Sequence, residues 1–434
     1  MIDQQRWRFS GKLDDLSDAD RDGLFSRATN EDPSIVRRAS EIVDDVRARG
    51  DNVLRELAML FDGASLESLE VSRTTVRRAL DATPTDLRRA LERAACNIAT
   101  VHGAFMPASM EVESEPGIMV GRRTDPLQRV GVYAPGGRAV YPSSVLMGAI
   151  PARVAGVGEV ILCSPPGRDG IPSQAVLAAA ALADVDRVFA IGGAGAIAAM
   201  AFGTESVPSV DRIVGPGNAY VAAAKLLVAR QVAIDSPAGP SELVVIADDS
   251  VDAALVATEM VAQAEHDPLA RVIAVAVGEM AADEIERALT IAARRAERAE
   301  IVRDALGSGG GVLCAASVDE AVVFSNRFAP EHLLLCVSDA EVALRSVRNA
   351  GTVFLGAHAS VAFGDYMTGA NHVLPTGGLA RSYSGLSPLD FVRWTTYQRV
   401  SVAAATRLAS DVGVFADAES LPGHAAAARQ WSAR

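Results

Sequence analysis

The spacing of hydrophobic residues changes along the chain and divides it into helical and strand-rich regions. Between about residues 32 and 105, apolar positions such as Ile35, Ile42, Val43 and Val46 recur every three or four residues, with charged residues between them. This spacing predicts amphipathic helices. From residue 129 onward, short apolar runs at 130–134, 160–164, 187–191 and 212–216 alternate with helical segments, and we expect each run to form a strand.

A second series of apolar runs follows at 242–248, 272–277, 312–316, 332–337 and 352–356, again with helical segments between them. Alternation of strand and helix requires parallel strands joined by helical crossovers. We therefore predict an α/β fold with two incomplete, Rossmann-like parallel-sheet domains and helical arms at both ends. The expected parts are an N-terminal arm (1–30), a first α/β domain (31–130 plus 246–384), a second α/β domain (131–245) and a C-terminal helical tail (385–434).

Composition narrows the class of protein. The 434 residues carry a formal net charge of −13, and no long basic run is present, so a nucleic-acid partner is not expected. No apolar stretch is long enough to predict a membrane span, and the N-terminus lacks the apolar core of a signal peptide. The four cysteines lie far apart without a CxxC pair, which argues against a disulfide framework or a cysteine-bound zinc site and favours a cytoplasmic location.

One acidic segment resembles the start of a calcium-binding loop. Asp18, Asp20, Asp22 and Gly23 have the right spacing, but the glutamate that should complete such a loop is missing. We favour a helix start, with Ser17 as the N-cap and the aspartates in the first turn.

A glycine-rich turn follows the strand expected at 187–191. Residues 193–198 fit the pattern GxGxxA at a point where a strand leads into a helix. This context favours dinucleotide binding, because glycines let the backbone approach a pyrophosphate. A tightly packed strand–helix turn without a ligand has the same composition.

Two pairs of polar residues have the chemistry of an active site. Gln263 and His266 are three positions apart near the end of a helix, so both could reach one ion; a hydrogen-bonded pair is the alternative. Glu331 and His332 lie side by side at the start of an apolar strand, where burial can bring both pKa values toward neutrality for proton transfer. The alternative there is a solvated loop before a core strand.

The segment 364–378 is a long glycine-rich loop that contains Asp365 and His372. Loops of this kind in compact domains are usually functional or disordered. Asp365 could bind a metal through oxygen, and His372 could contact a metal or a substrate. Near the C-terminus, His424 follows Glu419 by five residues, and a surface position is the plain alternative for this histidine.

Six sequence blocks together resemble the histidinol dehydrogenase family over nearly the whole chain. They are VGVYAPGGRAVYPSSVLM, FGTESVPSVDRIVGPGNAYV, PAGPSE, QAEHDPLA, APEHL and GDYMTGANHVLPTGG, in the order and spacing of that family. The resemblance implies oxidation of L-histidinol through L-histidinal to L-histidine with reduction of two NAD⁺, in the last steps of histidine biosynthesis. It also implies a bound zinc ion and a homodimer whose active site is shared between the subunits.

The resemblance further implies a role for each matching residue. His332 would take the alcohol proton, and Glu331 would activate the water that adds to the aldehyde. The implied zinc ligands are Gln263, His266, Asp365 and, from the other subunit, His424. The implied substrate contacts are these six residues together with Ser241, His372 and Glu419. The implied cofactor contacts are Tyr133, Asn218 and the backbone at Gly195.

Gly195 stands where the family commonly has a glutamine that contacts the dinucleotide. The resemblance therefore implies an altered contact here, which closer approach of the backbone could replace. A related enzyme that oxidises another small amino or hydroxy alcohol with zinc and NAD⁺ is the alternative function.

Overall fold

The computed structural model describes residues 7–27, 32–136 and 140–432, and the chain divides into two compact units. The first unit lies within 1–105 and 128–391 and contains two large sheets. The second lies within 106–127 and 392–434 and contains a small sheet. In the described ranges, no helix is long and apolar enough to cross a membrane.

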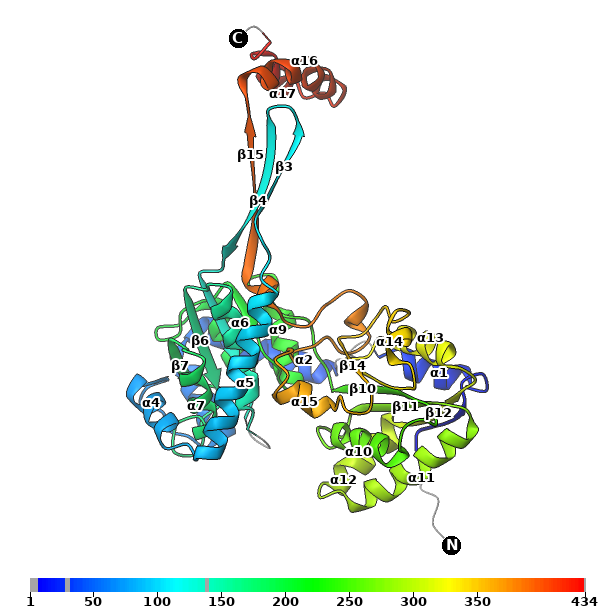
Figure 1. The fold of residues 1–434 in the computed structure, drawn as a ribbon. Helices are drawn as coiled ribbons and strands as arrows, with labels where there is room; N and C mark the ends of the chain where they lie inside the picture. The colour runs from blue at the N-terminus through cyan, green and yellow to red at the C-terminus, as the bar shows by residue number, and fades with distance from the viewer. Residues whose placement is uncertain (1–6, 28–31, 137–139, 433–434) are drawn as a thin grey trace. The chain divides into compact units, whose positions relative to one another are not determined.

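The first large sheet, sheet I, is parallel throughout and has the strand order β1-β12-β11-β10-β13-β14 (Figure 1). Its strands are β1 (Phe9–Lys12), β10 (Glu242–Ala247), β11 (Arg271–Val277), β12 (Gly311–Ala315), β13 (His332–Cys336) and β14 (Thr352–Leu355). Side chains alternate between the two faces of a strand. Leu243 and Val245 pack into the core on one face, and Val244 and Ile246 into the core on the other. Burial of both faces explains why the central strands, such as β10 and β13, are nearly continuous apolar runs.

Helices cover both faces of sheet I. One core includes α10 (Ala253–Ala264), α11 (Glu279–Arg295) and α12 (Ala299–Gly309). The opposite core includes α1 (Asp18–Phe25), α13 (Val318–Phe328) and α14 (Ala340–Leu344). The start of α1 is as predicted, because the Ser17 side chain caps it by accepting a hydrogen bond from the amide of Asp20.

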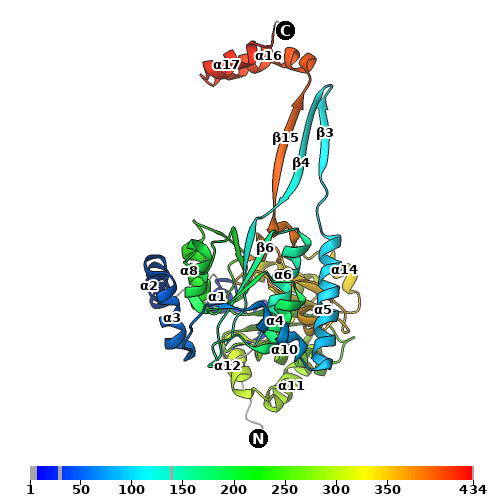
Figure 2. The same cartoon turned by 90° about the vertical axis from the view of Figure 1, so that its left-hand side faces the viewer.

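The second large sheet, sheet II, has the order β2-β7-β6-β5-β8-β9 and is parallel except for β2. Its strands are β2 (Glu70–Val71), β5 (Arg129–Tyr133), β6 (Glu159–Ser164), β7 (Arg187–Ala190), β8 (Arg212–Val214) and β9 (Ala233–Ile234). On one side α6 (Pro142–Val154) and α7 (Gln174–Leu182) pack with α4 (Arg73–Asp81) and α5 (Thr85–Ala104). On the other, α8 (Gly193–Phe202) and α9 (Ala219–Val228) pack with α2 (Pro33–Arg49), and α3 (Asp51–Leu57) packs on α8 (Figure 2).

The two large sheets share one topology. Numbered by their order in the chain, β10–β14 and β5–β9 each lie in the order third, second, first, fourth, fifth. Each sheet is extended beyond its third strand by a strand from the N-terminal region, β1 or β2. The predicted α/β class with two Rossmann-like parallel sheets is thus confirmed. The first and fourth strands adjoin in both sheets, and this is where such folds form a ligand crevice.

Within the first unit, the expected division of the chain differs from the structure in two places. Residues 9–12 form β1 and pair with β12, so this part of the expected N-terminal arm is a strand of sheet I. The helices of residues 33–104 pack on the helices of sheet II, although the sequence grouped them with the other domain. Both strands, β1 and β2, are too short to show a periodic pattern, and helix amphipathicity alone does not say which sheet a helix covers.

The second unit is a three-stranded antiparallel sheet followed by two helices. The sheet has the order β15-β4-β3, formed by β3 (Met110–Glu115), β4 (Ile118–Pro126) and β15 (Val392–Val400). The helices are α16 (Val402–Ala418) and α17 (Pro422–Arg429). The expected helical tail therefore includes a nine-residue strand. All six residues of β3 are exposed, so no buried face imposed an alternating pattern on its sequence.

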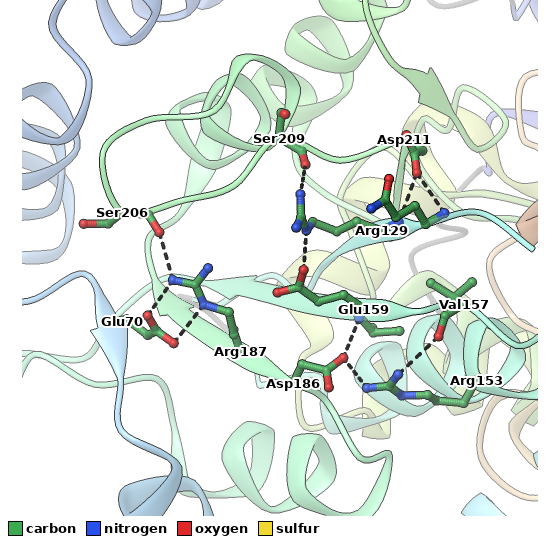
Figure 3. A network of polar contacts seen from close by, with 12 residues as sticks. Glu70, Arg129, Arg153, Val157, Glu159, Asp186, Arg187, Ser206, Ser209 and Asp211 are labelled. Atoms are coloured by element: carbon green, nitrogen blue, oxygen red, sulfur yellow. Dashed lines mark hydrogen bonds and ion pairs between the residues drawn. The ribbon is translucent and has the colours of Figure 1, made fainter.

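Ion pairs connect neighbouring strands at the amino-terminal edge of sheet II. Arg129, Glu159 and Arg187 each begin a strand there, and Figure 3 shows Arg129 paired with Glu159 and Arg187 paired with Glu70. The Asp211 carboxylate accepts two backbone N–H groups, those of Gln128 and Arg129, each at 3.0 Å. Exposed ion pairs contribute little individually, about 0–1 kcal/mol each, but here they join neighbouring strands at one edge. The glycine-containing turns lie at the opposite, carboxyl-terminal edge.

A prediction follows for Gly215, which comes directly after β8 at that carboxyl-terminal edge. Its φ is +116°, and a Cβ atom there would lie 2.1 Å from the carbonyl oxygen of Tyr133 on β5. We expect Gly215→Ala to lower the free energy of unfolding by roughly 2 kcal/mol or more, because both the backbone conformation and the contact are unfavourable.

Thermal unfolding measures this effect, with Gly103→Ala in helix α5 as the matched control. A Cβ at Gly103 meets no atom within 4 Å, so this variant should be neutral or slightly stabilised. Equal melting temperatures for Gly215→Ala and Gly103→Ala would contradict the close approach of β5 and β8.

Candidate active site

Glu331 and His332 lie at the amino-terminal edge of sheet I, where β13 begins. Helix α13 ends at Phe328, and Ala329 follows with a left-handed φ of 53°. Pro330 cannot continue the helix, so the chain turns directly into the strand. The backbone there is fixed by β14, since Gly351 donates to the Pro330 carbonyl at 2.9 Å and Thr352 to the Glu331 carbonyl at 3.0 Å.

Glu242, the first residue of the neighbouring strand β10, forms hydrogen bonds with the side chains of both Glu331 and His332. β10 and β13 pair in parallel with Leu243 opposite His332, which places Glu242 beside the Glu331–His332 pair. The backbone amide of Glu242 donates to Glu331 Oε2 at 2.8 Å. The Glu242 carbonyl accepts a hydrogen bond from His332 Nδ1 at 3.1 Å. Because a carbonyl can only accept, Nδ1 carries a proton, and Nε2 is the nitrogen left for chemistry.

The free nitrogen of His332 faces a second carboxylate. Nε2 lies 3.6 Å from Asp365 Oδ1 and is buried without a hydrogen-bond partner, while Nδ1 lies 3.5 Å from Glu331 Oε2. Burial lowers the pKa of His332, but the charges of Glu331 and Asp365 outweigh it and raise the pKa to about 10. The imidazole is therefore held between two acids, in a position to exchange a proton through Nε2.

Two other histidines predicted for the site, His372 and His266, lie near Asp365. Asp365 lies near the end of α15 (Val361–Tyr366), and its carbonyl accepts from His372 Nδ1 at 2.9 Å. Burial raises the pKa of Asp365, but His332, His372 and His266 exert stronger opposing effects, so the pKa stays below its usual value. Burial lowers the pKa of His372. The structure thus groups Glu331, His332, Asp365 and His372, with His266 close enough to act on Asp365 electrostatically.

Gln263 and His266 lie at the end of α10. Gln263 is in the last turn, and the amide of His266, just beyond the helix, bonds to the Gln263 carbonyl at 3.3 Å. The Gln263 side chain is 3% exposed, and its amide nitrogen has no hydrogen-bond partner. A buried amide without a partner is costly unless a ligand satisfies it.

The side chains near Asp365 offer enough nitrogen and oxygen donors for a cation only when Gln263 is counted among them. Among the described residues, no three His, Cys, Asp or Glu side chains form a metal-binding group by themselves. The Gln263 amide, the exposed His266 and the Asp365 carboxylate together offer three suitable donors. A fourth predicted ligand, His424, lies in α17 of the second unit and is exposed, as is Glu419 at the end of α16.

The residues expected to bind a dinucleotide lie along the carboxyl-terminal edge of sheet II. Tyr133 ends β5, and its hydroxyl accepts a hydrogen bond at 3.0 Å from the amide of Gly193, where α8 begins. Burial raises the pKa of Tyr133 to about 12, so the hydroxyl stays protonated. Asn218 caps α9 by accepting from the amides of Tyr220 and Val221, each at 3.1 Å.

Gly195 has a packing role that the sequence did not reveal. A Cβ atom at this position would lie 2.8 Å from Leu57 and 3.3 Å from Leu54, both on the neighbouring α3. The absence of a side chain therefore lets α8 approach α3 closely. A larger side chain at this position would require the ends of these leucine side chains to move aside. A cofactor contact through the backbone of Gly195 stays a prediction.

Three polar residues near the candidate sites were not predicted from the sequence. The sequence analysis counted Glu242 only as the first residue of the apolar run 242–248, although a glutamate at the start of a buried strand is a usable signal. Lys225 and Asp235 hold the turn at Gly215, since Lys225 donates to the Gly215 carbonyl at 2.9 Å and Asp235 accepts its amide at 2.7 Å. No local pattern marks these two residues, because their partners are distant in sequence.

Comparison with known proteins identifies the family. The histidinol dehydrogenase family model matches residues 25–431. A histidinol dehydrogenase from Natronomonas pharaonis is 48% identical over 413 residues, covering 95% of this chain and 96% of the relative. One from Methanosarcina barkeri is 44% identical over 419 residues, 96% of each chain. The crystal structure of histidinol dehydrogenase from Elizabethkingia anophelis superposes with a TM-score of 0.93 at 32% identity, covering 99% of this chain and 98% of that one. The chain therefore belongs to the histidinol dehydrogenase family and is an oxidoreductase.

Proposed function

We propose that this chain oxidises L-histidinol through L-histidinal to L-histidine with two NAD⁺, as a zinc-binding homodimer of the cytoplasm. The observation that carries the proposal is the arrangement of His332 between Glu331 and Asp365, with Nδ1 bound to the Glu242 carbonyl and Nε2 free. The four cysteines are unpaired, which suits a reducing compartment.

His332 is the proposed base of both oxidations. Its Nε2 takes the proton of the alcohol while the carbon-bound hydrogen leaves as hydride to NAD⁺, which gives the aldehyde and NADH. The hydrogen bond from Nδ1 to Glu242 fixes the ring so that this nitrogen faces the substrate. A cation at Asp365 would offset the charge of that carboxylate and lower the pKa of His332 toward neutrality, where an unprotonated Nε2 is available.

Glu331 is the proposed base for the step between the two oxidations. It accepts a proton from water as the water oxygen adds to the aldehyde carbon, and a hydrate forms. The hydrate then transfers its carbon-bound hydrogen as hydride to the second NAD⁺ and loses two protons, the first to His332 Nε2 and the second to solvent, which leaves the carboxylate product. The Glu242 amide holds Glu331 Oε2 at 2.8 Å throughout, so the carboxylate keeps one orientation.

Zinc would be held by Gln263, His266, Asp365 and His424 of the partner subunit. When bound, it orients the substrate beside His332, a template role. Ser241, which precedes β10, together with His372 and Glu419 would contact the substrate. The grouping of His332, His372 and His266 around Asp365 supports this assignment, in which the Gln263 side chain would bind the metal through its amide oxygen.

NAD⁺ would bind at the carboxyl-terminal edge of sheet II, near Tyr133, the turn at Gly193–Gly195, and Asn218. Neighbouring strands β5 and β8 adjoin there at the point where the strand order reverses, which is where α/β sheets bind nucleotides. A cavity of about 670 Å³ adjoins this edge, lined by residues that include Pro135, Ser164 and Gln174. Residues 137–139 of the loop after β5 lie outside the described part of the chain.

The second unit supports the homodimer. Its buried residues in α16 and α17 are small, namely Ala404, Ala409, Gly413, Ala416 and Ala425. Large side chains are exposed on the same unit, with Val402 at 62%, Val414 at 64% and Phe415 at 70%. Exposed apolar side chains on such a small unit are candidates for an interface, and a second copy of the chain would cover them.

The first prediction of this proposal is the reaction itself. Purified protein with zinc, L-histidinol and excess NAD⁺ should form two NADH for each histidinol consumed. The alternative is an enzyme that prefers another small amino or hydroxy alcohol. It is suggested by Gly195, which stands in place of the family's glutamine. A panel of such alcohols separates the two, because preference for a compound without an imidazole would overturn histidinol as the substrate.

A second prediction concerns His332. We expect His332→Asn to lower kcat by roughly 10²–10⁴-fold, the usual contribution of a general base, while zinc content stays at the wild-type level. The control is His358→Asn, because His358 is an exposed histidine outside the proposed site. Near wild-type turnover by His332→Asn, measured as NADH formation, would refute the assignment of the base.

A third prediction tests the shared site. His424→Ala and His332→Asn should each be nearly inactive alone, but mixing the two variants under conditions that exchange subunits should restore activity. In a two-fold symmetric dimer, a hybrid has one site with both residues intact, so random exchange should give about a quarter of wild-type activity. Full activity of a monomeric species, or no recovery in verified hybrids, would contradict a site completed by the partner.

A further inference from the structure

A buried ion pair lies next to the Glu331–His332 pair and has no assigned role. Arg27 Nη1 and Glu242 Oε1 are 2.9 Å apart, and the two side chains are 4% and 3% exposed. Burial lowers the pKa of Arg27 to about 10 and raises that of Glu242 to about 7, with each partner opposing the shift of the other. A buried pair of this kind is rarely required for stability, because well-packed apolar residues of similar size would serve as well.

Arg27 contacts the chain on both sides of the candidate site. Besides Glu242 on β10, its guanidinium donates through Nη2 to the carbonyl of Phe328, the last residue of α13. The centre of the guanidinium also lies 3.2 Å from the centroid of the Phe328 ring. Only three residues separate Phe328 from His332. The Arg27 side chain therefore contacts both the segment that precedes β13 and the first residue of β10.

Glu242 completes the connection through its own backbone. Its amide binds the Glu331 carboxylate and its carbonyl binds His332 Nδ1, while its side chain accepts from the amide of Gly377 at 3.0 Å. A rotation of residue 242 would therefore move the partners of both acid–base groups together. The Arg27 guanidinium is the planar, two-armed group that can bind a carboxylate and a carbonyl at once.

We propose that Arg27 and Glu242 are positioning residues that fix the geometry of Glu331 and His332 for proton transfer. The proposal rests on the proposed function, in which these two side chains are the bases. It explains why two charges are kept in the interior at a place where sheet I begins. Neither residue is among the proposed substrate contacts, so their loss should act on the reaction rate and not on substrate or NAD⁺ binding.

The test compares Arg27→Met with the matched control Arg21→Met. Arg21 lies in α1 and also binds backbone carbonyls, those of Leu13 and Leu16, each at 3.1 Å, without contacting β10 or β13 through any of them. We expect Arg27→Met to lower kcat by about 10- to 100-fold, as misplacement of a base by about 1 Å does, with KM for both substrates within about threefold. Arg27→Lys should recover part of the loss, because it restores the charge but not the second arm. Arg21→Met should keep wild-type kcat.

Hydrogen exchange at the Glu242 amide provides a readout independent of turnover. This amide is bound to the Glu331 carboxylate, and it should exchange faster in Arg27→Met than in the wild type or in Arg21→Met. If Arg27→Met does not fold, Arg27→Lys and Glu242→Gln carry the same test, with kcat lowered and KM retained. Wild-type kcat in these variants, or an equal loss in Arg21→Met, would overturn the proposal. A wild-type protein inactive on histidinol would instead refute the proposed function, while faster exchange would still support the positioning of Glu331.

Discussion

The parallel pairing of β10 with β13 is the constraint on which the candidate site depends. Leu243 lies opposite His332 in this register, so the peptide groups of Glu242 face the two residues that begin β13. A shift of one residue would turn His332 to the other face of the sheet and would separate Glu331 from the Glu242 amide. Leu243 and Val244 are buried in opposite cores, and this alternation maintains the register. Arg27 contacts Glu242 at the start of β10 and Phe328 shortly before β13. Hydrophobic packing thus sets the position of the acid–base groups.

The two large sheets have one topology, and the two proposed sites lie at opposite edges of them. In sheet II the turns at the carboxyl-terminal edge carry the glycines and the exposed Asn218, as nucleotide-binding sheets do. At the corresponding edge of sheet I, beyond β10 and β13, the Asp248 carboxylate accepts hydrogen bonds from the amides of Ser338 at 2.9 Å and Ser250 at 3.0 Å. The acid–base pair lies at the other end of the same strands. The segment after Asp365 also contacts helices of sheet II, because Asn97 in α5 donates to the Met367 carbonyl and Asn371 donates to the Met147 carbonyl in α6.

The sequence was sufficient to predict the two parallel sheets and the Glu331–His332 pair, because buried strands are continuous apolar runs and a charged pair at their start stands out. It was insufficient for β1, β2 and β3, which are short or exposed and depend on partners far away in the chain. It also missed Arg27 and Glu242, since an arginine after α1 carries no sign that it will reach β10. At Gly195 the resemblance to the family implied an altered cofactor contact, and only the structure shows that the Leu57 side chain packs close to this position.

The most direct test of a metal-assisted site at the β10–β13 edge is anomalous diffraction at the zinc absorption edge, from crystals grown with zinc and L-histidinol. We predict one zinc peak per active site, bound by Asp365, Gln263 and His266 and completed by His424 of the partner subunit, with the substrate hydroxyl within hydrogen-bond reach of His332 Nε2. A zinc peak remote from Asp365, or a substrate hydroxyl that faces away from His332, would contradict the account.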